Sequence, residues 1–507
     1  MARTSKLRHE GDRLTDLINV GVLTKQFPLG EIKRVLEETG RSSKRQRDLP
    51  AHVMMYYVIT MALYRQEGMR EVLRVLLEGL GIVLGLGIRL QAAGKSGISQ
   101  ARSRLGEEPL KRLYEQAVNP IATPKTQGAF YRDWQTVAMD GSTLEAPDTP
   151  ANEEAFGRPP SPSGGQSAYP LIRVVGLVEV GTHVLFGAVL GSYATGEVTL
   201  AREVVRHLRP GMLCLADRYF PGYPLWKQAT ETGAELVWRV RQAIHFPVVE
   251  RFPDGSFLSW FRPPRAKKGE PRGEPIPVRV IDYQVEGPKR KEETIRIITS
   301  ILDWQAAPAE ELAEVYHERW EFETALDELK THMRGARTVL RSQTPELVRQ
   351  ECYGLLLAHF AIRGLMHEAA LSAGRDPDRI SFVHTLRVVR RTLPRFAAIS
   401  PSGLGGAARD GGSPNPRGGR RATKVASGKA RREAQAEQVR SKTANRQEPE
   451  SPYCAKADFV WLLQRIHSPL LPSPDRQISA AVAAHRDRRA PDPRFARGYP
   501  LRLVRKP

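Results

Sequence analysis

The sequence predicts an α/β fold in which a mixed sheet follows a helical segment and is interrupted by a second β-rich segment. Three observations predict it. Apolar residues follow helical spacing up to about residue 127, strands alternate with helices from Thr136 to Val240, and strand-like patterning returns over 241–300. The length of 507 residues suggests about three domains, and 41% hydrophobic residues are enough to bury sizeable cores. We expect units at 1–127, 128–240, 241–300, 301–396 and 397–507.

The first unit is expected to be an α-helical N-terminal domain. Glu31–Glu38, Ala51–Arg65 and Ser99–Ala117 carry apolar residues at helical spacing, and Pro50 suits the first turn of a helix. Arg41–Arg47 forms a basic loop between the first two helices.

The second unit opens with a buried strand, TVAMD, that is expected to end at Asp140. A loop rich in Pro, Gly and Ser should follow from Glu145 to Gly165. Two strand-like runs meet at Gly181–Thr182, which is a hairpin signal. The elements expected after the hairpin are a helix at Glu197–Leu208, a strand at Met212–Asp217, a helix at Pro224–Thr232 and a strand at Leu236–Val240. A hairpin followed by βα units resembles the ribonuclease-H-like fold.

Residues 241–300 are expected to form a β-rich insertion into that core. Asp254–Gly255 is a hairpin turn, Arg262–Arg272 is a basic, Pro-rich loop, and Pro277–Gln284 and Thr294–Ile301 read as strands. Helices should follow at Pro308–His332, Pro345–Leu371 and Ile380–Arg391. Residues 401–450 hold 11 basic and 5 acidic side chains with few large apolar ones, which predicts a basic, largely disordered tail.

The overall composition narrows the class of protein. Lys and Arg number 77 and Asp and Glu 56, a net charge of +21 that favours a polyanionic partner, most often nucleic acid. The apolar runs are shorter than the ~18–20 residues that span a bilayer. The polar start MARTSKLRHEGDR argues against a secretory signal. Cys214, Cys352 and Cys454 match no disulfide or zinc spacing, so we expect a reducing cytosol.

Three carboxylates stand out as candidates for metal chemistry. Asp140 and Asp217 are each expected to end a buried strand, where side chains of an α/β sheet point into the ligand-binding crevice, although such residues also serve as helix caps or turn formers. The helix at Pro308–His332 adds Glu323. Three converging carboxylates repel one another, and two divalent ions ~3.5–4 Å apart would resolve the repulsion. Oxygen ligands favour Mg²⁺ or Mn²⁺.

The same helix carries Tyr316, Arg319 and Lys330. With Glu323, these residues fall within about 60° of arc on an ideal helix, so one face presents a carboxylate, two cations and a phenol. The alternative is a solvent-exposed face stabilised by salt bridges.

The spacing Y-x2-R-x3-E-x6-K at Tyr316, Arg319, Glu323 and Lys330 resembles the signature of DDE transposases of the insertion element 4 family. The surrounding runs MDGSTL, LADRYF, LVWRVR and ELAEVYHERWEFETALDELK are also similar to that family. The resemblance covers about Leu14 to Leu371 and not the tail. Tyr219 stands where relatives often have Gly.

The resemblance implies a role for each residue. Asp140, Asp217 and Glu323 would be catalytic and would bind two Mg²⁺ or Mn²⁺ ions. Tyr316, Arg319 and Lys330 would hold phosphates of the transposon end. Two further candidates for DNA contact are Arg239 and Arg241, which share one face of a strand and have ordinary surface pairing as the alternative. Trp260, or failing that Trp238, would stack on a flipped base, unless it belongs to the core.

The function implied is cut-and-paste transposition, in which hydrolysis at the transposon ends exposes 3′-hydroxyls that attack target DNA. The partner would be double-stranded DNA, both terminal inverted repeats and target, bound by a homodimer in the cytoplasm at the nucleoid. Residues 1–127 would recognise the DNA end, with a structural or dimerising role as the alternative. The rival functions are a catalytically silent DNA-binding relic and a ribonuclease-H-like nuclease without strand transfer.

Overall fold

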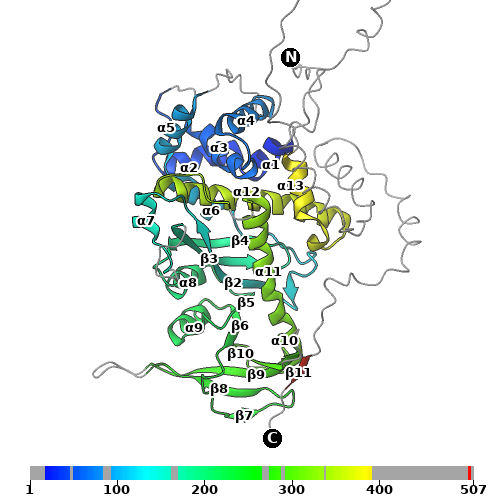
Figure 1. Ribbon diagram of the computed structural model, residues 1–507. Helices are drawn as coiled ribbons and strands as arrows, with labels where there is room; N and C mark the ends of the chain where they lie inside the picture. Colours follow the sequence, from blue (N-terminus) through cyan, green and yellow to red (C-terminus); the bar gives the residue numbers. More distant parts are fainter. Residues whose placement is uncertain are drawn as a thin grey trace, which may run out of the picture. The chain divides into compact units, whose positions relative to one another are not determined.

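A computed structural model of the protein (Figure 1) describes residues 18–45, 49–83, 93–160, 169–264, 273–286, 292–335, 338–390 and 501–503. The tail expected at 397–507 therefore lies outside the described residues, apart from 501–503. No helix in these ranges is long and apolar enough to cross a membrane.

The described residues from 18 to 117 that lie in regular structure are all helical. The helices are α1 (Ile18–Gln26), α2 (Leu29–Glu38), α3 (Ala51–Leu63), α4 (Met69–Val83), α5 (Lys95–Leu105) and α6 (Glu108–Ala117). The single helix expected at Ser99–Ala117 is two helices, because Gly106 ends α5 with φ +74° and Pro109 lies in the first turn of α6. Helix α4 was not predicted from the sequence. Its glycines lower its intrinsic helix propensity, and its buried apolar residues stabilise it through tertiary packing.

One mixed sheet runs through the rest of the described chain. Its strands follow the order β4-β3-β2-β5-β6-β10-β9-β8-β7, with β1 beside β2 and β11 beside β9. The bounds are β1 (Phe130–Tyr131), β2 (Trp134–Glu145), β3 (Leu171–Glu179), β4 (Val184–Ser192), β5 (Met212–Ala216), β6 (Glu235–Val240), β7 (Glu250–Arg251), β8 (Phe257–Phe261), β9 (Ile276–Glu286), β10 (Glu292–Thr299) and β11 (Leu501–Leu503).

The first five long strands have the expected order of a hairpin followed by βα units. β2 pairs antiparallel with β3 and parallel with β5, and β5 pairs parallel with β6. The intervening helices are α8 (Glu197–Val204), which continues as a 3-10 turn, and α9 (Tyr223–Thr230). The predicted loop at Glu145–Gly165 instead contains α7 (Pro150–Phe156), which Thr149 caps by accepting a hydrogen bond from the Asn152 backbone.

Asp140 does not end its strand, contrary to expectation. β2 continues for five residues to Glu145, all paired with β3. The parallel pairing of β2 with β5 stops at Met139 and Ala216. Asp140 thus lies at the point where β2 is still paired with β3 but no longer with β5. Its side chain is therefore next to the end of β5.

Residues 241–300 are rich in strands, as expected. β7 and β8 form the hairpin around Asp254–Gly255, and β9 pairs with both β8 and β10. β10 pairs antiparallel with β6, so these strands extend the same sheet.

The helix expected at Pro308–His332 is not one regular helix. It comprises α10 (Ala309–His317), a 3-10 turn at Glu318–Trp320, α11 (Glu321–Asp327) and a π-helical turn at Glu328–Met333. A 3-10 turn winds more tightly than an α-helix and a π turn more loosely, so the arc calculated for an ideal helix does not hold. α12 (Pro345–Ala373) and α13 (Phe382–Arg390) match expectation, with a 3-10 turn at Pro377–Arg379 between them.

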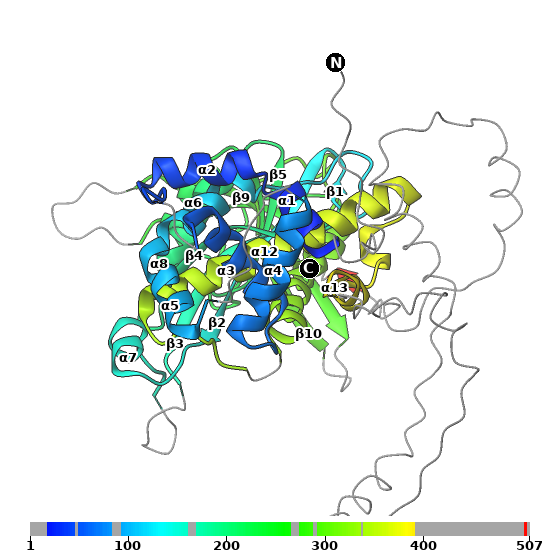
Figure 2. The ribbon, with the colours of Figure 1, turned by 90° about the horizontal axis from the view of Figure 1, so that it is seen from above.

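α12 connects the N-terminal helices to the sheet. It contacts α1, α3 and α6 on one side and β4 on another, and nearly all of its middle is buried. In the view from above, α1 and α3 lie over it (Figure 2). Glu351 of α12 is 3% exposed and pairs with Arg65, which follows α3. It also accepts hydrogen bonds from the backbone and hydroxyl of Ser342, at 3.1 and 2.6 Å.

We expect Glu351→Ala to lower the free energy of unfolding by about 3–5 kcal/mol, because Arg65 would remain buried without its partner. Burial alone would raise the pKa of Glu351, but the charges of Arg65 and Arg102 hold it below its usual value. Its stabilisation is therefore present above the unfolded pKa of about 4.3 and is lost as the pH falls through the lower folded value. Urea unfolding at several pH values measures both effects. Glu346→Ala, an exposed change on the same helix, is the control and should change little.

Candidate active site

Asp140 and Asp217 lie side by side at the edge of two parallel strands. Each is the next residue after the last registered pair of β2 and β5, Met139 and Ala216. Asp140 Oδ1 accepts a hydrogen bond from the backbone of Gly141 at 2.7 Å. Asp217 Oδ1 accepts one from the backbone of Tyr219 at 2.8 Å, so this aspartate also shapes the turn that follows β5.

Negative charge is concentrated around Asp140. Burial, together with the charges of Asp217 and Glu197, raises the pKa of Asp140 to about 6 against the opposing effects of Gly141 and Arg319. Glu197 of α8 pairs with Arg173 and its side chain lies against Gly141. The sequence reading passed over Glu197 because its position at the start of a helix is an ordinary place for an acidic residue.

The helix that carries Glu323 contacts β2 through its two cations. Arg319 Nη1 lies 2.9 Å from Asp140 Oδ2, and its Nη2 lies 3.9 Å from Glu323 Oε1. Lys330 Nζ donates to Ser142 Oγ at 2.8 Å. Burial lowers the pKa of Lys330, with a further contribution from Arg334. Arg319 thus lies between the first and third candidate carboxylates.

The four signature residues do not share one solvent-exposed face, because the helix is irregular. Tyr316 and Arg319 are buried, whereas the Glu323 side chain is 51% exposed. Burial raises the pKa of the Tyr316 phenol to about 12. Within the described part of the chain, Asp140, Asp217 and Glu323 do not form a group whose ligand atoms all lie within 4.8 Å of one another.

A cleft opens beside this edge of the sheet, with a volume of about 690 Å³. Arg239 and Arg241 both line it, and Arg239 pairs there with Glu293. Arg218 and Arg241 lie over the exposed ring of Tyr219, at 5.6 and 5.7 Å. The sequence reading missed Arg218 and Tyr219 as cleft residues, although both directly follow Asp217 in LADRYF.

The two candidate tryptophans differ in exposure. Trp260 is half-buried on β8, in register with Pro277 of β9. Trp238 is fully buried and packs edge-on against Trp226, with ring centroids 5.2 Å apart. Trp238 therefore belongs to the core and cannot stack on a nucleotide.

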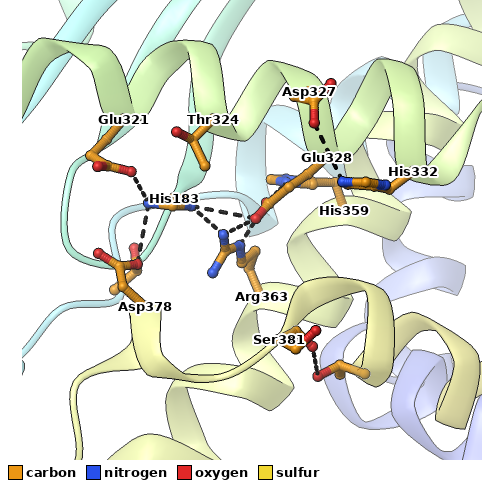
Figure 3. Close-up of polar contacts among 12 residues, drawn as sticks. His183, Glu321, Thr324, Asp327, Glu328, His332, His359, Arg363, Asp378 and Ser381 are labelled. Atoms are coloured by element: carbon orange, nitrogen blue, oxygen red, sulfur yellow. Dashed lines mark hydrogen bonds and ion pairs between the residues drawn. The ribbon is translucent and has the colours of Figure 1, made fainter. Parts of the chain in front are cut away.

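A second polar cluster, unseen in the sequence, joins three distant segments (Figure 3). His183 lies in the β3–β4 turn with φ +57°, Glu321 on α11 and Asp378 in the 3-10 turn after α12. Burial and Arg363 lower the pKa of His183, but Glu321, Glu328 and Asp378 together raise it to about 9. On the other side of the ring, Glu328 pairs with Arg363 and accepts from His359 at 3.1 Å.

Comparison with known proteins identifies the family. Residues 17–115 match the family described as the insertion element 4 transposase N-terminal region, and residues 133–361 match the transposase DDE domain. The chain belongs to the insertion element 4 family of DDE transposases. It is therefore a DNA transposase, from an enzyme family that uses divalent metal ions.

Individual relatives agree with this assignment. The chain is 29% identical over 375 residues to "Transposase InsG for insertion sequence element IS4" of Escherichia coli K12, covering 73% of this chain and 82% of that protein. It is 26% identical over 217 residues to "Putative transposase InsZ" of the same strain, covering 43% and 70%. A cryo-EM structure of the piggyBac transposase synaptic complex with hairpin DNA covers 74% of this chain and 79% of its own, at 12% identity and a TM-score of 0.38. A TM-score that low does not establish a shared fold.

The residues at the sheet edge fit a divalent ion. All three candidate side chains offer carboxylate oxygens, the ligands that Mg²⁺ and Mn²⁺ prefer. Burial and the charges of Asp217 and Glu197 raise the pKa of Asp140, and Arg319 offsets only part of that rise. A bound cation would supply that compensation.

Proposed function

We propose that the protein is a cut-and-paste transposase that hydrolyses DNA at transposon ends and joins the exposed 3′-hydroxyls to target DNA. The observation that carries the proposal is the juxtaposition of Asp140 and Asp217 on adjacent parallel strands, with Arg319 linking Asp140 to Glu323. The catalytic core would be ribonuclease-H-like, preceded by the helices of 1–127 and interrupted by a β-rich insertion at 241–300.

In this proposal Asp140, Asp217 and Glu323 hold two Mg²⁺ or Mn²⁺ ions. When bound, such ions activate the attacking oxygen and stabilise the leaving one. Glu323 is exposed enough to turn toward the aspartates once DNA is bound. With Asp140 holding an ion, Arg319 would be free to contact a phosphate of the DNA.

DNA would enter along the cleft lined by Arg239 and Arg241. These guanidinium groups contact backbone phosphates, with Tyr316, Arg319 and Lys330 closer to the cut. Trp260 remains the candidate platform for a flipped base, since its ring is only half-buried. Two ends held together would require a homodimer, and the protein would act in the cytoplasm at the nucleoid.

Residues 1–127 would supply recognition of the transposon end. A cleft with a volume of about 330 Å³ lies between α2, α3 and α5 and is lined by Arg41, Lys44 and Arg104. These cations are placed where a DNA backbone could lie. The basic tail would add affinity that does not depend on sequence and that falls steeply with salt.

An integration assay tests the proposal. Full-length protein, Mg²⁺ and short duplexes that carry the inverted repeats flanking the gene, with preformed 3′-hydroxyl ends, are mixed with supercoiled plasmid. We expect covalent joining of the duplex to the plasmid. Cleavage without joining would instead identify a nuclease, and DNA binding without either reaction would identify a catalytically silent relic.

A further inference from the structure

The cluster of His183, Glu321 and Asp378 has the geometry of an ion site separate from the sheet edge. His183 Nε2 lies 2.7 Å from Glu321 Oε2 and 3.2 Å from Asp378 Oδ1 (Figure 3). One ligand atom from each residue lies within 4.8 Å of the other two, and no other group of three His, Cys, Asp or Glu side chains in the described ranges does so. Glu321 and Glu323 are two residues apart on α11, so they point to nearly opposite sides of that helix.

His183 Nε2 points into this cluster, where it has ion-pair contacts with two carboxylates but no hydrogen bond. Its side chain is 3% exposed, and Nε2 is buried with no acceptor in hydrogen-bond geometry, despite the two nearby oxygens. Those oxygens therefore lie off the direction in which an Nε2–H would donate. A buried polar nitrogen in this state needs another partner.

The carboxylates of the cluster favour binding of a cation. Glu328 is already compensated, because Arg363 pairs with it and donates from Nε at 2.8 Å, and His359 donates a further hydrogen bond. Glu321 and Asp378 have no comparable cation beyond His183 among the described residues. With His183 protonated, the three side chains carry a net charge of −1. A divalent ion that displaces the proton from Nε2 leaves two carboxylates, a neutral imidazole and the ion, which together carry no net charge.

We propose that His183, Glu321 and Asp378 bind one divalent transition-metal ion, with Zn²⁺ preferred. One imidazole nitrogen and two carboxylate oxygens are a common ligand set for zinc and bind it more tightly than they bind Mn²⁺ or Mg²⁺. Bonds of about 2.0–2.2 Å in a tetrahedral site place neighbouring ligand atoms roughly 3.4 Å apart. The separations of 2.7 and 3.2 Å from His183 Nε2 would therefore widen slightly when the ion binds. The Asp378 side chain is 37% exposed, which gives the ion a route in and leaves room for a water ligand.

The surroundings of His183 suit a ring bound through Nε2. Such a ring carries its proton on Nδ1, and metal-bound histidines usually donate that proton to a carboxylate. Glu328 Oε1 lies 3.5 Å from Nδ1, on the side of the ring away from the ion. Arg363 Nη2, which can only donate, also contacts Nδ1, so this group must shift onto Glu328, to which Arg363 Nε already donates, when Nδ1 carries the proton.

The ion would link the β3–β4 turn, through His183, and the turn after α12, through Asp378, to the helix that carries Glu321 and Glu323. This consequence rests on the proposed function, but binding of the ion does not. Its role is that of a structural clamp, because no ligand of the site faces the cleft.

Metal binding to the full-length protein tests the proposal directly. Protein treated with a chelator is titrated with Co²⁺, whose visible absorption reports coordination, and then with Zn²⁺ as competitor. We expect one ion per chain, displaced by Zn²⁺ and not by millimolar Mg²⁺. Asp378→Asn and Glu321→Gln should each weaken binding about 100-fold or more. Because the Asp378 side chain is partly exposed, Asp378→Asn should disturb folding least. Thermal unfolding checks that this variant is folded.

Glu323→Gln is the matched control, since it lies on the same helix and belongs to the active site. It should bind the ion as wild type does while failing to cleave DNA. Failure of wild type to bind Co²⁺ or Zn²⁺, or unchanged binding in both ligand variants, would overturn the metal site and leave His183 as an imidazolium ion-paired with two carboxylates. A chain that binds the ion but performs no transposition would overturn only the proposed function.

Discussion

Asp140→Asn, Asp217→Asn and Glu323→Gln are each expected to reduce cleavage of transposon ends by at least a thousandfold while leaving DNA binding within a few-fold of wild type. An amide has nearly the shape of the acid but carries no negative charge, so the metal ions would lose a ligand and the reaction its charge stabilisation. Cleavage of a labelled end duplex in Mg²⁺ measures the first effect, and gel shift in Ca²⁺ measures the second.

Glu197→Gln serves as the control for that experiment. Glu197 raises the pKa of Asp140 through its charge but is paired with Arg173, so we do not expect it to bind an ion. It should retain cleavage within about tenfold. A triad variant that also cleaves within tenfold of wild type would remove that residue from the metal site.

Arg319→Ala is expected to lower cleavage by about 100-fold or more, comparable to the loss of one electrostatic group at a reacting centre. The buried guanidinium lies between Asp140 and Glu323, so its removal takes away the cation nearest to both. Arg319→Lys should recover only part of the activity, because an ammonium cannot make two directed contacts at once. Lys330→Ala should show the same pattern to a smaller extent.

The assay for Arg319 compares binding to a cleaved transposon end with binding to random duplex. We expect the complex with the cleaved end to weaken more, since Arg319 lies beside the proposed reacting phosphate. Arg132→Ala removes an exposed arginine that pairs with Glu311 and should affect neither complex. Equal losses on both DNAs would make Arg319 a general electrostatic contact.

The order of elements in the catalytic region could be predicted from sequence because each element has a strong local signal. Buried strands such as Met212–Ala216 are short apolar runs, and the hairpin at Gly181–Thr182 has a turn signature. The position of Asp140 could not be predicted, since β2 continues on one partner after it loses the other. That difference depends on the register between strands, which no single segment encodes.

The helix that carries Glu323 shows a second limit of local reasoning. The spacing of Tyr316, Arg319 and Glu323 predicts a common face. In the structure Arg319 contacts both Asp140 and Glu323. The 3-10 turn packs against β2 and the π-helical turn against α12 and α13, so the actual directions of these side chains depend on tertiary contacts. The cluster around His183 was not visible for a similar reason, because its three members come from a hairpin turn, α11 and a turn beyond α12.

The most direct test of the central claim is an anomalous scattering map of the protein bound to a cleaved transposon end in Mn²⁺. We predict two peaks about 3.5–4 Å apart, contacted by Asp140, Asp217 and Glu323 and lying beside the terminal phosphate. Absence of both peaks, or peaks that contact none of these three carboxylates, would contradict the assignment of the active site.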